Sequence, residues 1–381
     1  MTRRGLLGAA AALLAAPAGA APRTGSAFLV SAQGPGQGLL HRLTPGRDPI
    51  SREVPHAFHQ AQASTDGGSV LLCPMRTSRR WLLADARTLE IVAEAAISDG
   101  WSGGGHALFR PDGTLWTVER REAAWTGDPA GLEGRVVIRD ARTLRPLETL
   151  PSGGIRPHDL ALSPDPGLIA IAHYGSRGRD PDDRIGPDPA PLVIAPGVAL
   201  LDARTGVLRG FLPAARGDVE VRHLAVVEGA MLIGQTRSLD AADPEVAGRP
   251  RGLQDAERWR YAPAPLARSG AEGPIADIAP AGIHALSMVA DPRHGEVLVG
   301  LSGEDAILVV DAEGRERRRI DLRPLGCRSP SGIGLIDDDR YIVCGHRVGA
   351  WLLERGTHRP ADEAWPLLRL GSHSHLSIAQ A

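Results

Sequence analysis

The sequence predicts an all-β fold, a seven-bladed β-propeller of four-stranded antiparallel blades. One observation is a phrase that opens with histidine, continues as an alternating apolar run, and recurs at intervals of roughly fifty residues, as expected of repeated structural units. The other is that each interval holds several short apolar runs separated by Gly, Pro and Asp, which favours strands joined by tight turns.

The histidine phrase marks the first strand of each blade. Four copies end at an aspartate turn, and these copies span His59–Asp66, His106–Asp112, His158–Asp165 and His284–Asp291. His223 and His375 open two copies without that aspartate, and Ser331 stands at the same place in a seventh. The count of first strands therefore predicts seven blades.

A second phrase marks the end of the third strand. An apolar run reaches Asp-Ala-Arg-Thr at Asp85, Asp140 and Asp202, and Asp-Ala-Glu-Gly at Asp311. An aspartate followed closely by Thr or Gly favours a turn because its side chain bonds the backbone ahead. Two turns of this kind in each interval predict a four-stranded meander.

The two ends of the chain are expected to share one blade. Only a few residues follow His375, whereas three apolar runs before His59 belong to no other blade, namely Ala27–Val30, Leu39–Leu43 and Ile50–Val54. The C-terminal strand is therefore expected to join these N-terminal strands, which closes the ring and removes a free inner edge.

Two stretches are irregular and are expected to project from one face. Gly175–Ala195 interrupts the third blade, and Leu239–Ile278 is assigned to the outer part of the fourth blade plus a long connection, in which only Arg258–Tyr261 looks ordered. Connections of this length usually either carry a function or are disordered.

Residues 1–20 are interpreted as a signal peptide and residues 21–381 as the propeller. Arg3 and Arg4 precede an apolar stretch and an Ala-Gly-Ala site, which resembles a twin-arginine export signal; an ordinary secretory signal is the alternative. Both readings predict a periplasmic protein without a membrane anchor after cleavage.

Composition excludes several functions. The net charge is -2, so the sequence offers no basic surface for binding nucleic acid. Separately, we expect the protein to be a monomer. Of three cysteines, Cys327 and Cys344 are close enough in sequence to pair, with Cys73 as a small buried residue, and no haem-attachment motif occurs.

First strands line the axis of a propeller, so residues at their starts gather at one mouth of the axial channel. These residues are histidines in six blades, and imidazole is the commonest ligand for transition metals. The candidate metal ligands are therefore His59, His106, His158, His223, His284 and His375. A structural role, in which each ring bonds turns of its own blade, is the alternative.

A second polar set is expected at the ends of the second strands, which return to the same mouth. Arginines should stand near it, where they can pair with the glutamate or receive an anionic ligand in a forked contact. The candidate ligand-binding residues are Glu119, Arg156, His173, Arg222, Gln235, Arg237 and His346. Known nucleophile, phosphate-loop and dinucleotide motifs are absent from the sequence, so no catalytic residue is assigned.

The phrases around His106, Glu119, His158, His223 and Gln235 resemble those of an exported bacterial family of unknown function with WD40/YVTN-like propellers. Its members are often encoded beside imelysin-like iron-regulated proteins. The resemblance implies a role in iron or copper handling and an imelysin-like partner.

Three functions remain open from the sequence. The first is a periplasmic scaffold that binds a metal ion, iron or copper, or a metal-containing or anionic ligand. The second is a hydrolase or lactonase that uses a bound cation to polarise a carbonyl. The third is an interaction platform for the imelysin-like partner.

Overall fold

The computed structural model describes residues 24–34, 36–75, 78–122, 133–175, 195–239, 261–270, 273–345, 349–365 and 375–379. The predicted signal peptide, His346 and most of the two irregular stretches lie outside these residues.

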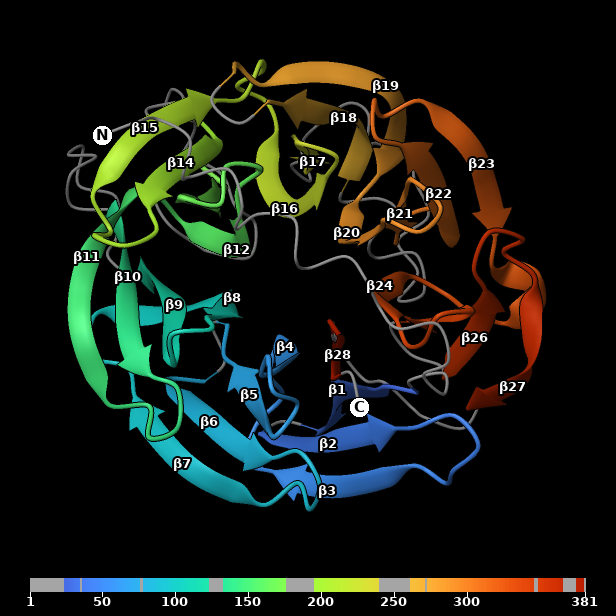
Figure 1. The fold of residues 1–381 in the computed structure, drawn as a ribbon, viewed down its shortest axis with the longest axis horizontal. Coiled ribbons are helices and arrows are strands. Elements are labelled where there is room, and N and C mark those ends of the chain that lie inside the picture. The colour runs from blue at the N-terminus through green and yellow to red at the C-terminus, as the bar shows by residue number, and fades with distance from the viewer. Residues whose placement is uncertain are drawn as a thin grey trace, which may run out of the picture.

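The described strands form seven separate four-stranded antiparallel sheets arranged in a ring, which confirms the predicted fold (Figure 1). The first strands of the sheets line the centre of the ring. The first sheet consists of β1 (Ser26–Gly34), β2 (Gln37–Leu43) and β3 (Ile50–Val54) together with β28 (Ser377–Ala379). The second consists of β4 (Gln60–Ala63), β5 (Ser69–Cys73), β6 (Arg80–Asp85) and β7 (Ile91–Ala96). The third consists of β8 (Trp101–Phe109), β9 (Thr114–Arg121), β10 (Glu133–Asp140) and β11 (Pro146–Ile155).

The other four sheets repeat the same order from the axis outward. They consist of β12 (Pro157–Leu162), β13 (Leu168–His173), β14 (Gly197–Asp202) and β15 (Leu208–Pro213); β16 (Glu220–Val227), β17 (Ala230–Ser238), β18 (Tyr261–Ser269) and β19 (Ala276–Ile283); β20 (Ala285–Asp291), β21 (Glu296–Leu301), β22 (Ala306–Asp311) and β23 (Glu316–Asp321); and β24 (Pro330–Leu335), β25 (Arg340–Gly345), β26 (Ala350–Glu354) and β27 (Pro360–Trp365).

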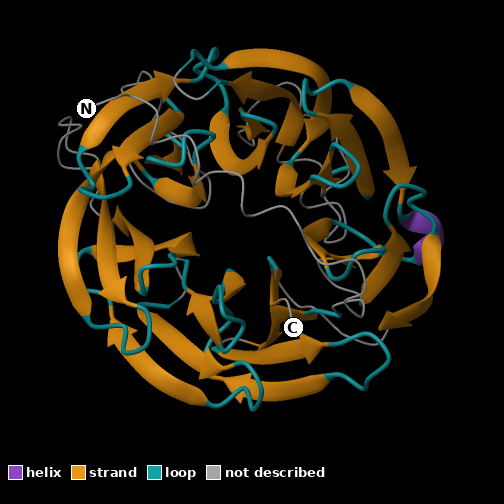
Figure 2. Ribbon diagram, viewed as in Figure 1, coloured by secondary structure: helices purple, strands orange, loops and turns teal. Residues whose placement is uncertain are grey.

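Helix is nearly absent from the described part of the chain. Its single helical element is the 3₁₀ turn η2 (Arg323–Leu325), at the edge of the ring (Figure 2). In the same residues no helix has the length and apolar character needed to cross a membrane.

The ring closes through strand β28, as the sequence predicts. Ser26 and Phe28 of β1 pair with Ala379 and Ser377 of β28 in an antiparallel register. The last strand of the chain therefore occupies the innermost position of the sheet that the first three strands build.

The hydrophobic core lies between neighbouring sheets rather than at the axis. Phe28 and Leu40 of the first sheet pack with Leu72 and Leu82 of the next, and the other six interfaces are filled in the same manner. Each blade thus buries one face against the blade before it and the other against the blade after it. Apolar burial of this kind is the main stabilising term.

The predicted aspartate turns form as expected. Asp85 Oδ1 accepts a hydrogen bond from the Thr88 N–H at 2.7 Å. Asp140 and Asp202 accept the equivalent bonds from Thr143 and Thr205, each at 2.8 Å. These bonds stop the third strand of these three sheets and reverse the chain into the outermost strand.

The sequence did not predict strand β18. Residues 258–260 of the segment expected to be ordered, Arg258–Tyr261, lie outside the described residues, and the described strand runs from Tyr261 to Ser269 and carries Pro263 and Pro265. Its pairing with β17 is interrupted between Ile233 and Arg237. The physical reason is that proline has no N–H to give to the ladder, so a proline-rich strand looks like a loop in the sequence.

All three cysteines are buried free thiols, so Cys327 and Cys344 do not form a disulfide in this structure. Cys73 and Cys344 pack in the hydrophobic clusters of their blades.

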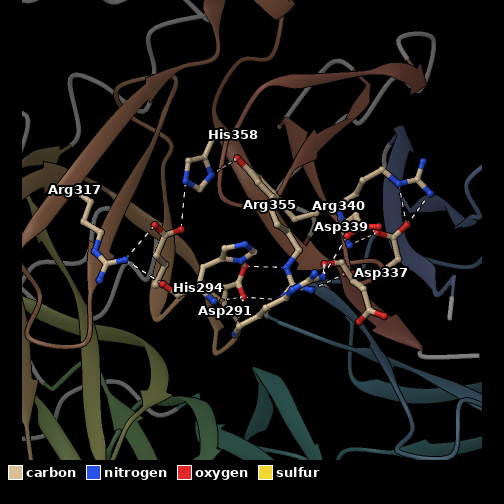
Figure 3. Close-up of polar contacts among 12 residues, drawn as sticks. Asp291, His294, Arg317, Asp337, Asp339, Arg340, Arg355 and His358 are labelled. Atoms are coloured by element: carbon tan, nitrogen blue, oxygen red, sulfur yellow. Dashed lines mark hydrogen bonds and ion pairs between the residues drawn. The ribbon is translucent and has the colours of Figure 1, made fainter. Parts of the chain in front are cut away.

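An ion-pair network joins the sheets β20–β23 and β24–β27 where β20 ends, at the opposite end of that strand from His284 (Figure 3). The Asp291 carboxylate accepts hydrogen bonds from Arg355 Nη2 and Nε at 2.5 and 2.9 Å. Arg355 also donates to the carbonyl oxygen of Asp337 at 2.8 Å. The side chains of Asp291 and Arg355 are only 2% and 7% exposed, so this contact is a buried bridge between two blades.

Candidate metal centre

Three of the axial histidines stand at irregularities in their strands. Pairing slips between Gly103 and Ala107 in β8, between Pro157 and Leu160 in β12, and between Val221 and His223 in β16. A β-bulge bends its strand and re-aims the side chain there. His106, His158 and His223 lie at these bulges.

His59 and His375 are brought together by the closure of the ring. The His375 N–H donates to the carbonyl oxygen of His59 at 3.0 Å, and His375 forms a parallel bridge with Gln60. The C-terminal segment therefore runs beside the start of β4 before it enters the first sheet as β28.

These five histidines form one cluster, which we call the axial histidine cluster: His59, His106, His158, His223 and His375. The centroid of the His106 ring lies 5.1 Å from that of His59, 4.6 Å from that of His158 and 5.2 Å from that of His223. The His375 ring lies 4.5 Å from His59 and 4.9 Å from both His106 and His223. Five blades thus each contribute one imidazole to the same small volume.

Two sets of three histidines within the cluster can hold a metal ion. In the set His59, His106 and His158, and in the set His106, His223 and His375, the ligand atoms lie within 4.8 Å of one another. Ligands that come from separate blades need no sequence adjacency, because the ring fixes their positions.

Burial keeps three rings of the cluster uncharged at neutral pH. Desolvation lowers the pKa of His106 to about 4 and that of His223 to about 3, and it holds the pKa of His158 well below its usual range. Only the neutral ring has a lone pair for a metal ion. These three rings are therefore in their metal-binding protonation state at pH 7.

The tautomer of His158 follows from its partner. His158 Nδ1 lies 2.6 Å from the carbonyl oxygen of Gly104. A carbonyl can only accept, so Nδ1 carries the hydrogen and the lone pair of the neutral ring is on Nε2. A bond of this kind is what orients metal-ligating histidines in proteins.

Asp159 faces two rings of the cluster. Its Oδ1 lies 3.6 Å from His106 Nδ1 and its Oδ2 lies 3.8 Å from His223 Nδ1. The backbone N–H groups of Leu160 and Leu224 fix the carboxylate by donating to Oδ1 at 2.9 Å and to Oδ2 at 3.0 Å. Burial raises the pKa of Asp159. Asp159 is therefore placed to orient both rings through Nδ1 and to leave Nε2 for a ligand.

The Nε2 atoms of His106 and His223 are buried and have no hydrogen-bond partner among the described residues. A buried polar atom left in this state costs on the order of 1 to 3 kcal/mol. Two such atoms in one cluster fit a metal ion, which would accept the lone pair of each.

The structure does not place His284 in this cluster. Its ring stacks on Tyr261 with the centroids 3.9 Å apart, its Nδ1 lies 2.7 Å from Ser302 Oγ, and its Nε2 lies 3.1 Å from Arg222 Nη1. His284 also has a left-handed φ of 58°. It precedes β20 rather than sitting in a bulge, so its ring turns toward its neighbours in blades β16–β19 and β20–β23.

The described members of the second predicted set, which leave out His346, do not come together as one site. Glu119 is fully buried, with Oε2 accepting from Arg135 Nε at 2.8 Å and Oε1 accepting from Arg139 at 2.7 Å. His173 is also fully buried, and its ring nitrogens lie 3.0 Å from the Ile171 carbonyl oxygen and 3.1 Å from Ser152 Oγ.

The amide of Gln235 donates to Asp277 Oδ1 at 2.7 Å. Arg237 Nε lies 3.1 Å from Asp218 Oδ2. The carbonyl oxygen of Arg156 accepts from the Tyr174 N–H at 3.2 Å. Each of these residues is tied to neighbours in its own part of the ring.

Arg222, a member of this set, adjoins the axial histidine cluster through Tyr174. Its guanidinium pairs with Glu220 at 2.5 Å and lies 4.9 Å above the ring of Tyr174. The Tyr174 ring in turn lies 4.7 Å from that of His158. Arg222 therefore packs on the Tyr174 ring, and that ring lies beside His158.

The sequence interpretation missed Asp159, Gly105 and Tyr174. Asp159 directly follows His158, and Gly105 directly precedes His106, so each is next to a predicted ligand. A Cβ at Gly105 would come 2.6 Å from His59 Cδ2 and 3.1 Å from His158 Cε1. Their nearness to a predicted ligand was the available signal, but only the fold shows which ring each one contacts.

The closed ring and its axial imidazoles define a β-propeller with a candidate metal centre. The chain belongs to the family described as protein of unknown function DUF1513, whose model matches residues 52–311. No curated protein matches the chain significantly.

Solved structures share the fold at low sequence identity. Apo AztD from Citrobacter koseri aligns with a TM-score of 0.51 and 11% identity over 94% of this chain and 99% of that chain. The dihydro-heme d1 dehydrogenase NirN in complex with DHE aligns with a TM-score of 0.52 and 13% identity over 96% of this chain and 77% of that chain. At these identities the likeness establishes the propeller architecture.

Proposed function

We propose that the protein binds one transition-metal ion at the axial histidine cluster and serves as a periplasmic scaffold for that ion. The observation that carries the proposal is the convergence of five imidazoles from five blades, two of which have buried Nε2 atoms with no partner in the described residues. Satisfying those atoms with a metal ion removes a cost that the folded chain otherwise bears.

The ligand type favours a late first-row ion. Both three-histidine sets are composed entirely of imidazole. Imidazole suits copper, zinc and iron, and for a given site affinity rises along the series to Cu²⁺. Hard cations such as Mg²⁺ and Ca²⁺ prefer oxygen ligands. We therefore propose copper or iron as the ion, with Cu²⁺ bound most tightly in a direct comparison.

An ion fits the cluster better than a haem does. Ring centroids separated by 4.5 to 5.2 Å leave no room for a macrocycle between the imidazoles. The dihydro-heme d1 dehydrogenase, a propeller named for a haem substrate, is related to this chain in fold at 13% identity. The hydrolase alternative gains no support from Glu119, because arginines engage both of its carboxylate oxygens.

The first test is the metal content of untagged protein exported by its own signal and purified without chelators. We expect about one equivalent of a transition metal per chain. In His106→Ala/His223→Ala the metal should be lost, whereas His56→Ala, which alters a histidine outside the cluster, should retain it. Less than about a tenth of an equivalent in the wild type, with no binding of added Cu²⁺, would contradict the proposal.

Periplasmic location and an imelysin-like partner belong to the same proposal. The location rests on Arg3 and Arg4 and the apolar stretch after them, and the partner rests on the family resemblance. A pull-down with the imelysin-like protein tests the partner. Binding should fall when the stretches 175–195 and 239–278 are both shortened, and binding that is unchanged by the shortening would exclude them as the docking surface.

A further inference from the structure

The axial histidine cluster is divided into two overlapping parts. We call His59, His106 and His158 the outer set, and His106, His223 and His375 the inner set. Within each set the ligand atoms lie within 4.8 Å of one another, and among the described residues these are the two groups that meet this condition. His106 belongs to both.

The two sets differ in exposure. Every member of the inner set is buried, whereas His59 of the outer set is half-buried. An ion arriving from solvent therefore meets the outer set first, because His59 is the one residue of the cluster that is not fully buried.

The two sets also differ in how well they hold a cation. Asp159 faces His106 Nδ1 at 3.6 Å and His223 Nδ1 at 3.8 Å, so its negative charge lies beside two of the three inner ligands. A buried cation is costly unless such a charge compensates it. The Nε2 atoms of His106 and His223 are both buried without a hydrogen-bond partner among the described residues; that of His106 serves both sets, whereas that of His223 belongs to the inner set alone. The inner set is thus the better resting position for the ion.

The shared ligand prevents both sets from being filled at once. One Nε2 lone pair binds one ion, and two divalent ions a few ångströms apart repel each other strongly. The rings of His59 and His375 are in contact, with centroids 4.5 Å apart, so the two sets adjoin without a barrier of protein between them.

We propose that a single ion enters through the outer set and then passes to the inner set while His106 stays bound to it. In this step the ion exchanges His59 and His158 for His223 and His375, with no change in charge or oxidation state. The inference rests on the proposed function, and it adds that the cluster is a two-position relay with His59 as the entry ligand and His375 as the resting ligand.

The test uses Co²⁺ as a spectroscopic probe, in stopped-flow mixing and equilibrium titration with the full mature chain. The wild type should bind about one Co²⁺ in two phases, of which only the first depends on the Co²⁺ concentration. His59→Ala should slow loading and release more than about tenfold while changing the equilibrium affinity little. His375→Ala should keep the fast first phase and lose more than about tenfold in affinity.

Two controls accompany these variants. His106→Ala should lose both phases, and His56→Ala should match the wild type. If His375→Ala fails to fold, as judged by thermal unfolding, His375→Gln serves in its place because it retains a polar group at the same position.

The outcomes separate the inference from the proposed function. Equal losses of affinity in His59→Ala and His375→Ala, with one kinetic phase throughout, would overturn the relay and leave a single binding position. Two Co²⁺ ions bound at once would overturn it as well. Failure of the wild type to bind Co²⁺, Cu²⁺ or Zn²⁺ would instead overturn the proposed function and the relay together.

Discussion

Gly105 lies directly against the ring of His59. A Cβ added to Gly105 would come 2.6 Å from His59 Cδ2, and the φ of Gly105 is +110°, a backbone conformation that side chains rarely adopt. The glycine therefore leaves the space in which His59 and His158 approach each other, and a residue without any ligand atom shapes the metal centre.

The first prediction concerns this glycine. Gly105→Ala should displace His59 and His158 and lower metal affinity by more than about tenfold, together with a loss of stability of about 1 to 3 kcal/mol. Gly113→Ala is the matched control, because Gly113 has a φ of +82° but nothing within 4 Å of its Cβ position. It should lose stability and retain affinity. Isothermal titration and urea unfolding measure the two quantities, and equal affinities in the two variants would exclude the steric argument.

The second prediction concerns the carboxylate that faces His106 and His223. Asp159→Asn should weaken metal binding by roughly 10- to 100-fold, because the amide orients the rings but lacks the compensating charge. Asp159→Ala should weaken it further. Asp165→Asn is the control, since the Asp165 side chain accepts a turn bond from the Gly167 N–H in the described structure and does not face the cluster. The visible spectrum of bound Co²⁺ should change in the Asp159 variants and not in the control; an unchanged spectrum would mean that Asp159 has only a structural role.

The fold could be predicted from the sequence because equivalent side chains form the same hydrogen bonds in several blades. Asp85, Asp140 and Asp202 each terminate a third strand by accepting N–H bonds, so their phrase could be recognised three times. Pro263 and Pro265 concealed β18 because tertiary pairing there overrides a local preference against strands.

The candidate site was less predictable because one repeat position can face different neighbours. His158 and His284 open equivalent strands, yet His158 lies at a bulge and faces the axis, whereas His284 is stacked on Tyr261 from the unpredicted strand β18. Glu119 looked like an exposed acid at a strand end, but Arg135 and Arg139 of the adjacent strand neutralise it. Partners of this kind depend on cross-strand register, which one sequence does not reveal.

The third prediction tests the bridge between the sheets β20–β23 and β24–β27. Arg355→Met leaves the Asp291 carboxylate buried without its main partner, and this should destabilise the protein by about 3 to 5 kcal/mol. The double variant Asp291→Asn/Arg355→Met should recover part of that loss, because no uncompensated charge remains. Metal affinity should be unchanged in any variant that folds, since the bridge is at the opposite end of β20 from His284 and the axis. A double variant no more stable than the single one would show that geometry, not charge, dominates here.

The fourth prediction is a loss of stability of the metal-free protein in mild acid. Burial lowers the pKa of His41 to about 4 and that of His173 to about 3, against about 6.5 in an unfolded chain. Below pH 6.5 these two rings therefore become protonated in the unfolded chain, whereas in the folded protein they stay neutral until about pH 4 for His41 and about pH 3 for His173. The free energy of unfolding consequently falls as the pH is lowered through this range. Each ring contributes up to ~1.4 kcal/mol per pH unit across this window and nothing above it.

His41 allows that prediction to be isolated, because its ring nitrogens are bonded to Ser31 and Ser51, away from the axial histidine cluster. Urea unfolding of the wild type and of His41→Asn at a series of pH values from about 7.5 to 4.5 gives the two slopes. The variant should be less stable at pH 7.5, because asparagine fills the site poorly. As the pH falls, however, its free energy of unfolding should decrease less steeply than that of the wild type, by up to ~1.4 kcal/mol per pH unit. Parallel curves would mean that the His41 ring takes up its proton at the same pH in the folded and unfolded chains, and that burial does not lower its pKa.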